Sequence, residues 1–265
     1  MKRFNLELRE IDTKQLKRFP AQESDTERIA DEPGVYLLGG KPAIIYGKLG
    51  DRYDRMLWAV KSLHYQTSTR TNGLKTTSRI FGFRPRIPLR SDFCSSTSMT
   101  HTHPTQHKII CEFGQLLASI YREYAPQTFD SHCEHLKTVR SEWVIPGSPF
   151  TSGIVNQNNQ LKYHFDTGNF ENVFSCMVVF RKDCEGGFLS MPALNTKFFL
   201  GDHTFLLFDG QAILHGVTPM NRMTKTAYRY SVVYYALRSM AQCLPCEEEL
   251  KRIRITKRVK EMKRR

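Results

Sequence analysis

Residues 173–237 read VFSCMVVFRKDCEGGFLSMPALNTKFFLGDHTFLLFDGQAILHGVTPMNRMTKTAYRYSVVYYAL. Short apolar runs in this stretch are separated by turn residues, and the runs are VFSCMVVF (173–180), GGFLSM (186–191), KFFL (197–200), TFLLF (204–208), AILH (212–215) and YRYSVVYYAL (228–237). Many short strands at regular spacing are typical of an antiparallel sandwich or barrel. The stretch therefore predicts a double-stranded β-helix of the jelly-roll type.

The sequence before residue 150 predicts helices instead. Apolar residues recur at steps of three and four in HKIICEFGQLLASIYREY (107–124), which indicates an amphipathic helix. A second helix is expected over 131–143, and VYLLGGKPAIIY (35–46) predicts two strands around a Gly-Gly turn. Residues 1–32 are charged and mixed, and they predict a peripheral helix or a loosely held arm. The expected fold class is α+β, with N-terminal helices packed on the jelly-roll core.

Three segments follow from these patterns. Residues 1–149 form an N-terminal α+β part that is integral to the same domain and includes a basic, DNA-contacting loop at about 65–98. Residues 150–242 form the jelly-roll core. Residues 243–265, which end in KRIRITKRVKEMKRR, form a basic helix or tail. DNA contact and a solvated helix without a partner are both open for that tail.

The chain carries a formal net charge of +13, which suits a polyanionic partner such as DNA or RNA. A solvated basic surface is the alternative. The charge is concentrated between Met56 and Ser91, where no acidic residue occurs. The basic residues of that stretch are Lys61, Arg70, Lys75, Arg79, Arg84, Arg86 and Arg90. Aromatic residues are interleaved with them, so the segment can contact phosphates and stack on bases.

The seven cysteines are scattered, and the N-terminus has no apolar core typical of a secretory signal. This pattern favours reduced thiols in an intracellular compartment, either the cytoplasm or nucleoid of a bacterial or phage-infected cell or a eukaryotic nucleus. Cys243-Leu-Pro-Cys246 is a lone CxxC pair, interpreted as ordinary thiols rather than a zinc or redox site. No stretch approaches the length of a membrane span.

A candidate metal site begins at His164-Phe165-Asp166. Residues i and i+2 of a strand point to the same face, so an imidazole and a carboxylate can enter one cavity. His215, at the end of the AILH run, is the third candidate ligand. Two histidines and one carboxylate on one face of a metal are typical of non-haem iron(II) oxygenases, whose open positions take a co-substrate and dioxygen. An HxD pair alone also arises by chance.

Two further residues point to the co-substrate. Arg229 lies 14 residues beyond His215 on the next expected strand, and Ser231 shares its face. A guanidinium can form a two-point ion pair with the C5 carboxylate of 2-oxoglutarate, and the hydroxyl can add a hydrogen bond. The metal ligands, which are also the catalytic residues, and these two anion-binding residues occur in the order that this chemistry requires.

Together, HFDTGNF, VFSCMVVF, EGGFLSMP, LFDGQAILHGVTP and YRYSVVYY resemble the TET/JBP family of DNA oxygenases, and they look closest to its phage and bacterial branch. The resemblance covers roughly residues 65–260. It implies that His164, Asp166 and His215 bind iron and that Arg229 and Ser231 bind 2-oxoglutarate.

The resemblance also bears on the substrate. Asn169 matches the position of a base-contacting Asn, although an Asn in a turn is an equal alternative. Leu237 stands where the animal enzymes have a base-contacting His, which puts cytosine recognition of their kind in doubt. A second co-substrate Arg is expected from the N-terminal half, and Arg79 is the candidate. Phe170 is a candidate to receive the base, and Arg84 and Arg86 are candidates to hold phosphates.

The expected function is hydroxylation of the 5-methyl group of 5-methylcytosine or thymine in DNA by a monomer that uses iron(II), 2-oxoglutarate and O2. The target base would be flipped out or single-stranded, because a stacked methyl group cannot easily reach the metal. Two alternatives remain: the same chemistry on RNA, a free nucleotide or a protein, and a non-catalytic jelly-roll that binds DNA. No membrane partner is expected.

Overall fold

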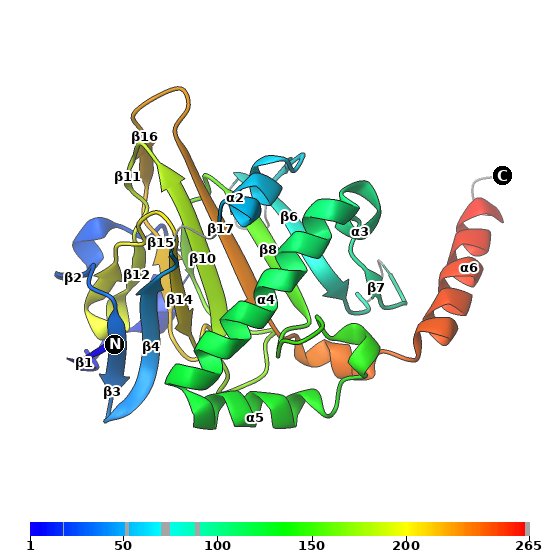
Figure 1. The fold of residues 1–265 in the computed structure, drawn as a ribbon, viewed down its shortest axis with the longest axis horizontal. Helices are drawn as coiled ribbons and strands as arrows, with labels where there is room; N and C mark the ends of the chain where they lie inside the picture. The colour runs from blue at the N-terminus through cyan, green and yellow to red at the C-terminus, as the bar shows by residue number, and fades with distance from the viewer. Residues whose placement is uncertain (18, 51–52, 70–74, 88–90, 263–265) are drawn as a thin grey trace.

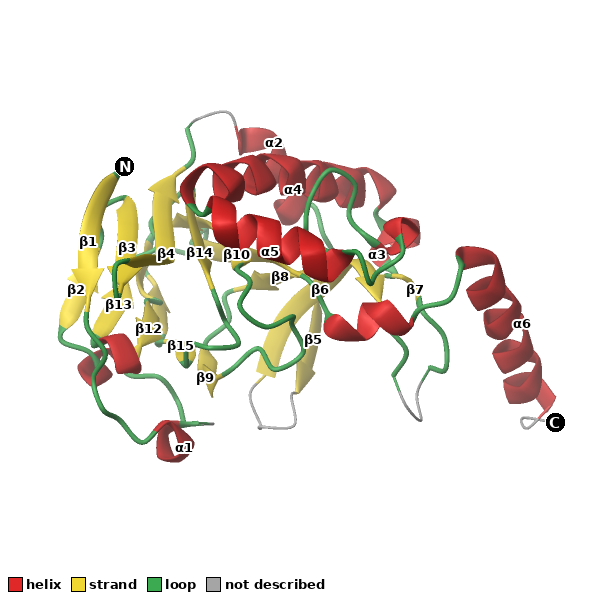
Figure 2. Ribbon diagram, turned by 90° about the horizontal axis from the view of Figure 1, so that it is seen from below, coloured by secondary structure: helices red, strands yellow, loops and turns green. Residues whose placement is uncertain are grey.

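The computed structural model describes residues 1–17, 19–50, 53–69, 75–87 and 91–262. It consists of two sheets that face each other and a group of helices that covers the outer face of the larger sheet (Figures 1 and 2). None of the helices in these ranges is long and apolar enough to cross a bilayer.

The larger sheet has ten strands, nine of them in the order β1-β3-β4-β14-β10-β17-β8-β6-β5, with β7 paired to β6. Its strands are β1 (Lys2–Leu6), β3 (Gly34–Leu38), β4 (Lys41–Lys48), β5 (Gln66–Thr69), β6 (Lys75–Arg84), β7 (Ser95–Ser96), β8 (Ser152–Gln157), β10 (Ser175–Lys182), β14 (Thr204–Phe208) and β17 (Tyr228–Tyr235). Antiparallel neighbours dominate, and only β1 pairs in parallel, with β3.

The smaller sheet has five strands in the order β2-β13-β12-β15-β9. They are β2 (Arg28–Ala30), β9 (Leu161–His164), β12 (Leu189–Met191), β13 (Thr196–Phe198) and β15 (His215–Val217). A separate two-stranded ribbon joins β11 (Cys184–Gly186) to β16 (Met220–Arg222).

The helices lie mainly on one side of the larger sheet (Figure 2). They are α1 (Thr13–Leu16), α2 (Asp54–Lys61), α3 (Met99–Thr102), α4 (Pro104–Tyr124), α5 (Pro126–Leu136) and α6 (Cys246–Met262). Short 3-10 turns span Glu23–Asp25, Ser141–Trp143, Pro192–Leu194 and Arg238–Gln242. The helix expected over 107–124 is confirmed as part of α4. The second helix, expected over 131–143, instead spans Pro126–Leu136, and Ser141–Trp143 form a separate 3-10 turn. A proline is well placed at the first helical position, because it lacks only an N–H that would be unpaired there anyway.

Alternation along β17 separates two apolar cores. Val232 and Tyr234 point toward α4, and the Tyr234 hydroxyl donates to the carbonyl of Ile110 at 2.7 Å. Successive strand residues point to opposite faces, so Arg229 and Ser231 face the smaller sheet instead. A second core, which includes Val179 of β10, fills much of the space between the sheets. Arg229 and Ser231 of β17 therefore point into the space between the two sheets.

The structure corrects two expectations for the N-terminal half. Residues 1–32 are not a peripheral helix or arm, because β1 and β2 each join a sheet by parallel pairing. Both are edge strands with one side exposed, so their composition is polar and gives a weak strand signal. Much of the segment at 65–98 is also not a loop. Among its described residues, β5 and β6 pair as antiparallel strands, and Ser78–Gly82 of β6 pair with β8.

The prediction of reduced thiols throughout is wrong at one pair, since Cys94 and Cys243 form a disulfide. The two residues are 149 positions apart, and their spacing therefore carried no pairing signal. The bridge ties the segment before β7 to the linker that precedes α6. The other five cysteines, including Cys246 of the CxxC pair, are free thiols.

Candidate functional site

A cavity of about 360 Å³ lies between the two sheets. The larger sheet contributes Asn156 of β8 and Arg229, Ser231 and other residues of β17. The smaller sheet contributes residues of β9, β12 and β15, and the loop after β9 closes one end. All five residues that the sequence assigned to metal and co-substrate line this one cavity: His164, Asp166, His215, Arg229 and Ser231.

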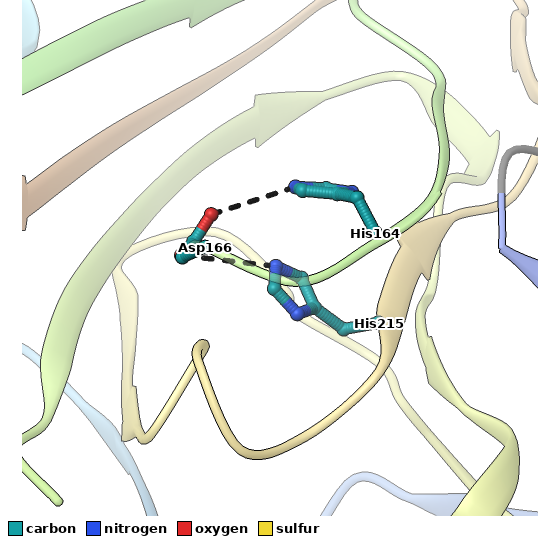
Figure 3. A group of neighbouring side chains, drawn as sticks. All are labelled: His164, Asp166 and His215. Carbon is teal, nitrogen blue, oxygen red and sulfur yellow. Dashed lines mark ion pairs between the residues drawn. The ribbon is translucent and has the colours of Figure 1, made fainter. Parts of the chain in front are cut away.

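His164, Asp166 and His215 form a group whose ligand atoms all lie within 4.8 Å of one another. The Nε2 atom of His164 is 3.7 Å from one carboxylate oxygen of Asp166, and Nε2 of His215 is 4.0 Å from the other (Figure 3). A single ion could therefore contact all three. Within the described ranges it is the one His/Cys/Asp/Glu cluster with such spacing.

Backbone carbonyls fix which nitrogen of each imidazole faces the cluster. Nδ1 of His164 lies 2.8 Å from the carbonyl of Lys162, and Nδ1 of His215 lies 2.9 Å from that of Ile213. A carbonyl oxygen only accepts, so each Nδ1 carries the proton and each Nε2 keeps its lone pair. This is the arrangement in which a second hydrogen bond orients a metal-binding histidine.

The fold places Asp166 differently from the expectation. β9 ends at His164, so Asp166 lies in the following loop rather than on the same strand. Its backbone N–H donates to the carbonyl of Gly210 at 2.8 Å. A Cβ atom at Gly210 would collide with the Asp166 carboxylate, so the absence of a side chain there leaves room for the ligand. The AILH run is likewise not a strand, because β15 only begins at His215.

Burial lowers the pKa of His215 to about 4, and the neighbouring His164 adds to the effect, while Asp166 and the Ile213 carbonyl oppose it. The imidazole is therefore neutral near pH 7, which is the form that binds a metal.

Arg229 is 2 % exposed, and its Nε and Nη2 atoms have no hydrogen-bond partner in the part of the chain that the structure describes. Burial lowers its pKa to about 10, and the adjacent Arg181 adds to this. Arg181 itself is satisfied by the carbonyls of Leu200, Cys184 and Gly186. A buried, unpaired guanidinium is costly unless an anion binds it. The arrangement is thus suited to a carboxylate ligand.

A row of buried amides continues from Ser231, and the sequence interpretation missed it. Asn156 Nδ2 donates to the Ser231 hydroxyl at 3.3 Å, and Asn159 Nδ2 donates to Asn156 Oδ1 at 3.1 Å. Both backbone groups of Thr77 hold the Asn159 amide in one orientation. The available signal in the sequence was the run of amide side chains NQNNQ (156–160), which contains both Asn156 and Asn159.

The two candidate base contacts are separated. Asn169 lines the cavity, is buried, and donates from Nδ2 to the Ser175 hydroxyl at 3.0 Å. Phe170 is not among the cavity residues. Its ring stacks on His135 with centroids 5.1 Å apart, inside a small core that includes Trp143.

None of the three candidate arginines of the N-terminal half lines the cavity. Arg79 pairs in register with Val155, whose side chain packs on the helical side, and its Nε donates to the carbonyl of His64 at 2.7 Å. Cross-strand partners share a face, so Arg79 points away from Arg229. Arg84 donates to the Ser95 hydroxyl, and Arg86 forms an ion pair of 2.7 Å with the buried carboxylate of Glu249.

Comparison with known proteins identifies the family. Residues 86–238 match Tet_JBP, described as the oxygenase domain of the 2OGFeDO superfamily. The chain belongs to this family. The match is to an oxygenase domain, and the residue types in the cavity fit the iron(II) and 2-oxoglutarate chemistry of that superfamily.

Curated relatives of this Tet_JBP oxygenase include thymine dioxygenase JBP1 of Trypanosoma brucei brucei, which is 27% identical over 161 residues. The aligned region is 60% of this chain and 19% of the relative. The bifunctional helicase and thymine dioxygenase JBP2 of the same organism is 28% identical over 138 residues, which are 52% of this chain and 12% of JBP2. The chain thus spans less than a fifth of the length of these relatives.

Among solved structures, the Tet_JBP chain is similar to NgTET1 in complex with 5mC DNA, with a TM-score of 0.59 and 15% identity. The superposition covers 84% of this chain and 88% of NgTET1. The prediction of an α+β fold with a double-stranded β-helix core is confirmed.

Proposed function

We propose that this oxygenase hydroxylates the 5-methyl group of a pyrimidine in DNA, thymine or 5-methylcytosine, to give the 5-hydroxymethyl base. The observation that carries the proposal is the convergence of His164, Asp166 and His215 with the unpartnered Arg229 in one cavity. The thymine dioxygenases among the relatives favour thymine as the first substrate to test. Membership of a phage or bacterial branch stays a prediction.

In this proposal the cluster of His164, Asp166 and His215 holds iron(II). Bound there, iron(II) would activate O2 so that one oxygen atom is inserted into the methyl C–H bond, and the other enters the new carboxylate of succinate as 2-oxoglutarate loses carbon dioxide. The protein supplies neutral imidazoles with their Nε2 lone pairs directed inward, and Gly210 leaves space for the carboxylate. These residues orient the site and do not themselves take up the methyl hydrogen.

Arg229 and Ser231 would bind the C5 carboxylate of 2-oxoglutarate. A carboxylate placed against the free Nε and Nη2 atoms of Arg229 would satisfy both donors at once, as in a bidentate pair. Ser231 is held by the Asn156 amide, and the chain of amides to Thr77 keeps that contact in one geometry. Arg79 is not proposed for this role, because its side chain lies on the other face of the sheet.

Asn169 is the residue that we propose to contact the base, since its amide reaches the cavity on the same loop as Asp166. Ser175 accepts from its Nδ2 atom and so fixes the orientation of the amide. The cavity lies between two sheets, so a base in duplex DNA would have to leave its stack to enter it. Phe170, buried against His135, is not proposed as a base contact.

The test is to incubate the protein with iron(II), 2-oxoglutarate and duplexes that contain thymine alone or thymine and 5-methylcytosine, and then to measure the digested nucleosides by mass spectrometry. Parallel reactions use RNA, a free nucleotide and a peptide pool. Hydroxymethylated nucleosides from DNA are expected, together with equimolar succinate. Product from RNA, nucleotide or peptide but none from DNA would overturn the DNA assignment, while Asp166→Ala should remove product in every arm.

A further inference from the structure

Helix α6 stands apart from the rest of the molecule in both views of the fold (Figures 1 and 2). It runs toward the same side as β5 and β9, and β9 ends at His164 (Figure 2). Only the first part of the helix contacts the protein, at a cavity of about 500 Å³ that is lined by Ile253 of α6 and by Phe83 and other residues of β6 and β7. Farther along the helix, Arg254, Ile255 and Arg258 are exposed.

The base of α6 is held firmly. The Glu249 side chain, 1 % exposed, accepts from Arg86 at 2.7 Å, from the Cys94 N–H at 3.0 Å and from the Leu244 N–H at 2.9 Å. The Trp143 indole donates to the Leu244 carbonyl at 2.8 Å. Together with the Cys94–Cys243 disulfide, these contacts fix the direction in which α6 leaves the protein. A tail that served only solubility would not need such an anchor.

The outer face of α6 carries a stripe of positive charge. Lys251, Arg254 and Arg258 are exposed and, at steps of three and four, lie on one side of the helix. That side is opposite Glu249 and Ile253, which face the protein. Within the described ranges, none of the three forms an ion pair or a hydrogen bond.

Beyond its acidic first turn (Glu247, Glu248 and Glu249), α6 is strongly basic. From residue 251 to the end, the sequence has nine Lys or Arg residues and one Glu. An exposed helix that only needs solubility normally mixes both signs, because Glu–Lys pairs at i and i+4 stabilise it. Basic residues outnumber acidic ones nine to one over this stretch, so most of its positive charges have no acidic residue at that spacing. Uniform positive charge on a rigid projection instead favours a polyanion as its partner.

We infer that α6 is an arm that binds the phosphate backbone of DNA beside the target base, through Lys251, Arg254 and Arg258. The identity of the polyanion rests on the proposed function. From Lys251 to Arg258 the helix rises by roughly 10 Å, which corresponds to about three phosphate steps along one strand of a duplex. Because Arg84 and Arg86 are engaged within the protein, α6 provides free cations that those two residues do not.

The test compares the unaltered protein with two triple variants that each lose three positive charges. One is Lys251→Gln, Arg254→Gln, Arg258→Gln. The matched control is Arg3→Gln, Arg28→Gln, Lys41→Gln, whose exposed residues lie on β1, β2 and β4 at the opposite end of the molecule (Figure 1). Binding to a fluorescent duplex is measured by anisotropy over a series of salt concentrations, and circular dichroism checks that both variants are folded.

Each phosphate contact contributes about 0.9 to the slope of log K against log salt. We expect the α6 variant to lower the magnitude of that slope by about 2 to 3 and to weaken binding about ten-fold or more near physiological salt. The control variant should keep nearly the original slope. Equal losses of affinity and slope in the two variants would show a general charge effect and would refute the role of α6. Unchanged slopes in both variants would refute it as well.

Product measurements separate this inference from the proposed function. Succinate formed without DNA should be the same in all three proteins, because α6 does not line the catalytic cavity. If DNA is hydroxylated but the α6 variant binds DNA as tightly as the control variant, the role of α6 in DNA binding is refuted and the proposed function stands. If only the α6 variant loses DNA binding and no methyl group is oxidised by any of the proteins, α6 is a DNA-binding helix but the assigned substrate is wrong.

Discussion

His164 and His215 are direct cross-strand partners in the antiparallel pair of β9 and β15, with ring centroids 4.4 Å apart. The pairing brings together two residues that are 51 positions apart in the sequence. A slip of one residue in this register would turn one imidazole to the opposite face of the sheet. The candidate metal site therefore depends on strand register as much as on the identity of its ligands.

Gly210→Ala should weaken iron binding although Gly210 is not a ligand. The new methyl group would collide with the Asp166 carboxylate and displace it from the two imidazoles. We expect a loss of roughly 10- to 100-fold in iron affinity, the range found when groups that support metal ligands are changed. Titration of the apoprotein with iron(II) measures it. Gly201→Ala is the control, because a Cβ there meets its nearest atom at 3.7 Å. Equal affinities for both variants would contradict the steric argument.

Arg229→Met should abolish turnover and yet leave the ligand-free protein as stable as before, or more stable. The substitution removes a buried charge that lacks a counter-ion, and replacement of such charges by apolar groups stabilises by roughly 1–4 kcal/mol where the site packs well. Thermal unfolding of the apoprotein checks the sign. Anaerobic addition of iron(II) and 2-oxoglutarate should raise the Tm of the unaltered protein more than that of the variant. A marked loss of stability in the apo variant would mean that Arg229 already has a structural partner.

Asn159→Asp should disturb co-substrate binding from a distance. The change replaces an amide that donates to the Thr77 carbonyl and to Asn156 Oδ1 with a carboxylate that repels both. A cost of about 1–3 kcal/mol in the free energy of unfolding is expected, together with a several-fold rise in KM for 2-oxoglutarate and a smaller effect on kcat. Asn221→Asp, on the exposed ribbon strand β16, is the matched control. An unchanged KM would show that the amide row does not position Ser231.

Acid should destabilise the fold through His132, which is fully buried, with neither ring nitrogen hydrogen-bonded among the described residues. Burial lowers its pKa to about 3, and His135 contributes. The unfolded chain binds a proton below about pH 6.5, whereas the folded chain does not until about pH 3. The neutral form thus contributes its full stability above pH 6.5, and roughly 1.4 kcal/mol is lost per pH unit below it.

Denaturant unfolding between pH 7 and pH 4 measures this dependence. His132→Leu should flatten the profile in that interval, because the replacement cannot bind a proton. His101→Leu, at an exposed position of α3, is the comparison. A profile that is equally steep in the His132 variant would place the acid sensitivity in other groups.

Several parts of the fold could be predicted because their signals are local. The apolar spacing in α4 and the short apolar runs of β14 and β17 are visible within single segments, and each was predicted close to its true position. The edge strands β1 and β2 were not predicted, since one exposed side makes their sequences polar. The segment before β7 was expected as a loop, because the pairing of β6 with β8 is a contact between distant residues.

The candidate site divides in the same way. The types and order of His164, Asp166, His215, Arg229 and Ser231 were readable, because an iron(II) and 2-oxoglutarate site requires those side chains. Arg79 was expected to bind the co-substrate and Phe170 to receive the base, but residue type and position in the chain do not reveal the direction of a side chain. The structure directs both away from the cavity, and Arg86, a candidate to hold phosphates, forms an ion pair with Glu249.

The sequence by itself determined the chemistry of this protein: its strand-rich half, its candidate ligands and its excess of positive charge are properties of residue type and spacing. Only the tertiary structure decided which arginines are free, since Arg229 is left unpaired while Arg86 is bound by Glu249. It also decided the Cys94–Cys243 bridge and the direction of α6. The physical reason is that a side chain pairs with whatever group lies beside it in space. For residues far apart in the sequence, only the folded chain sets that distance.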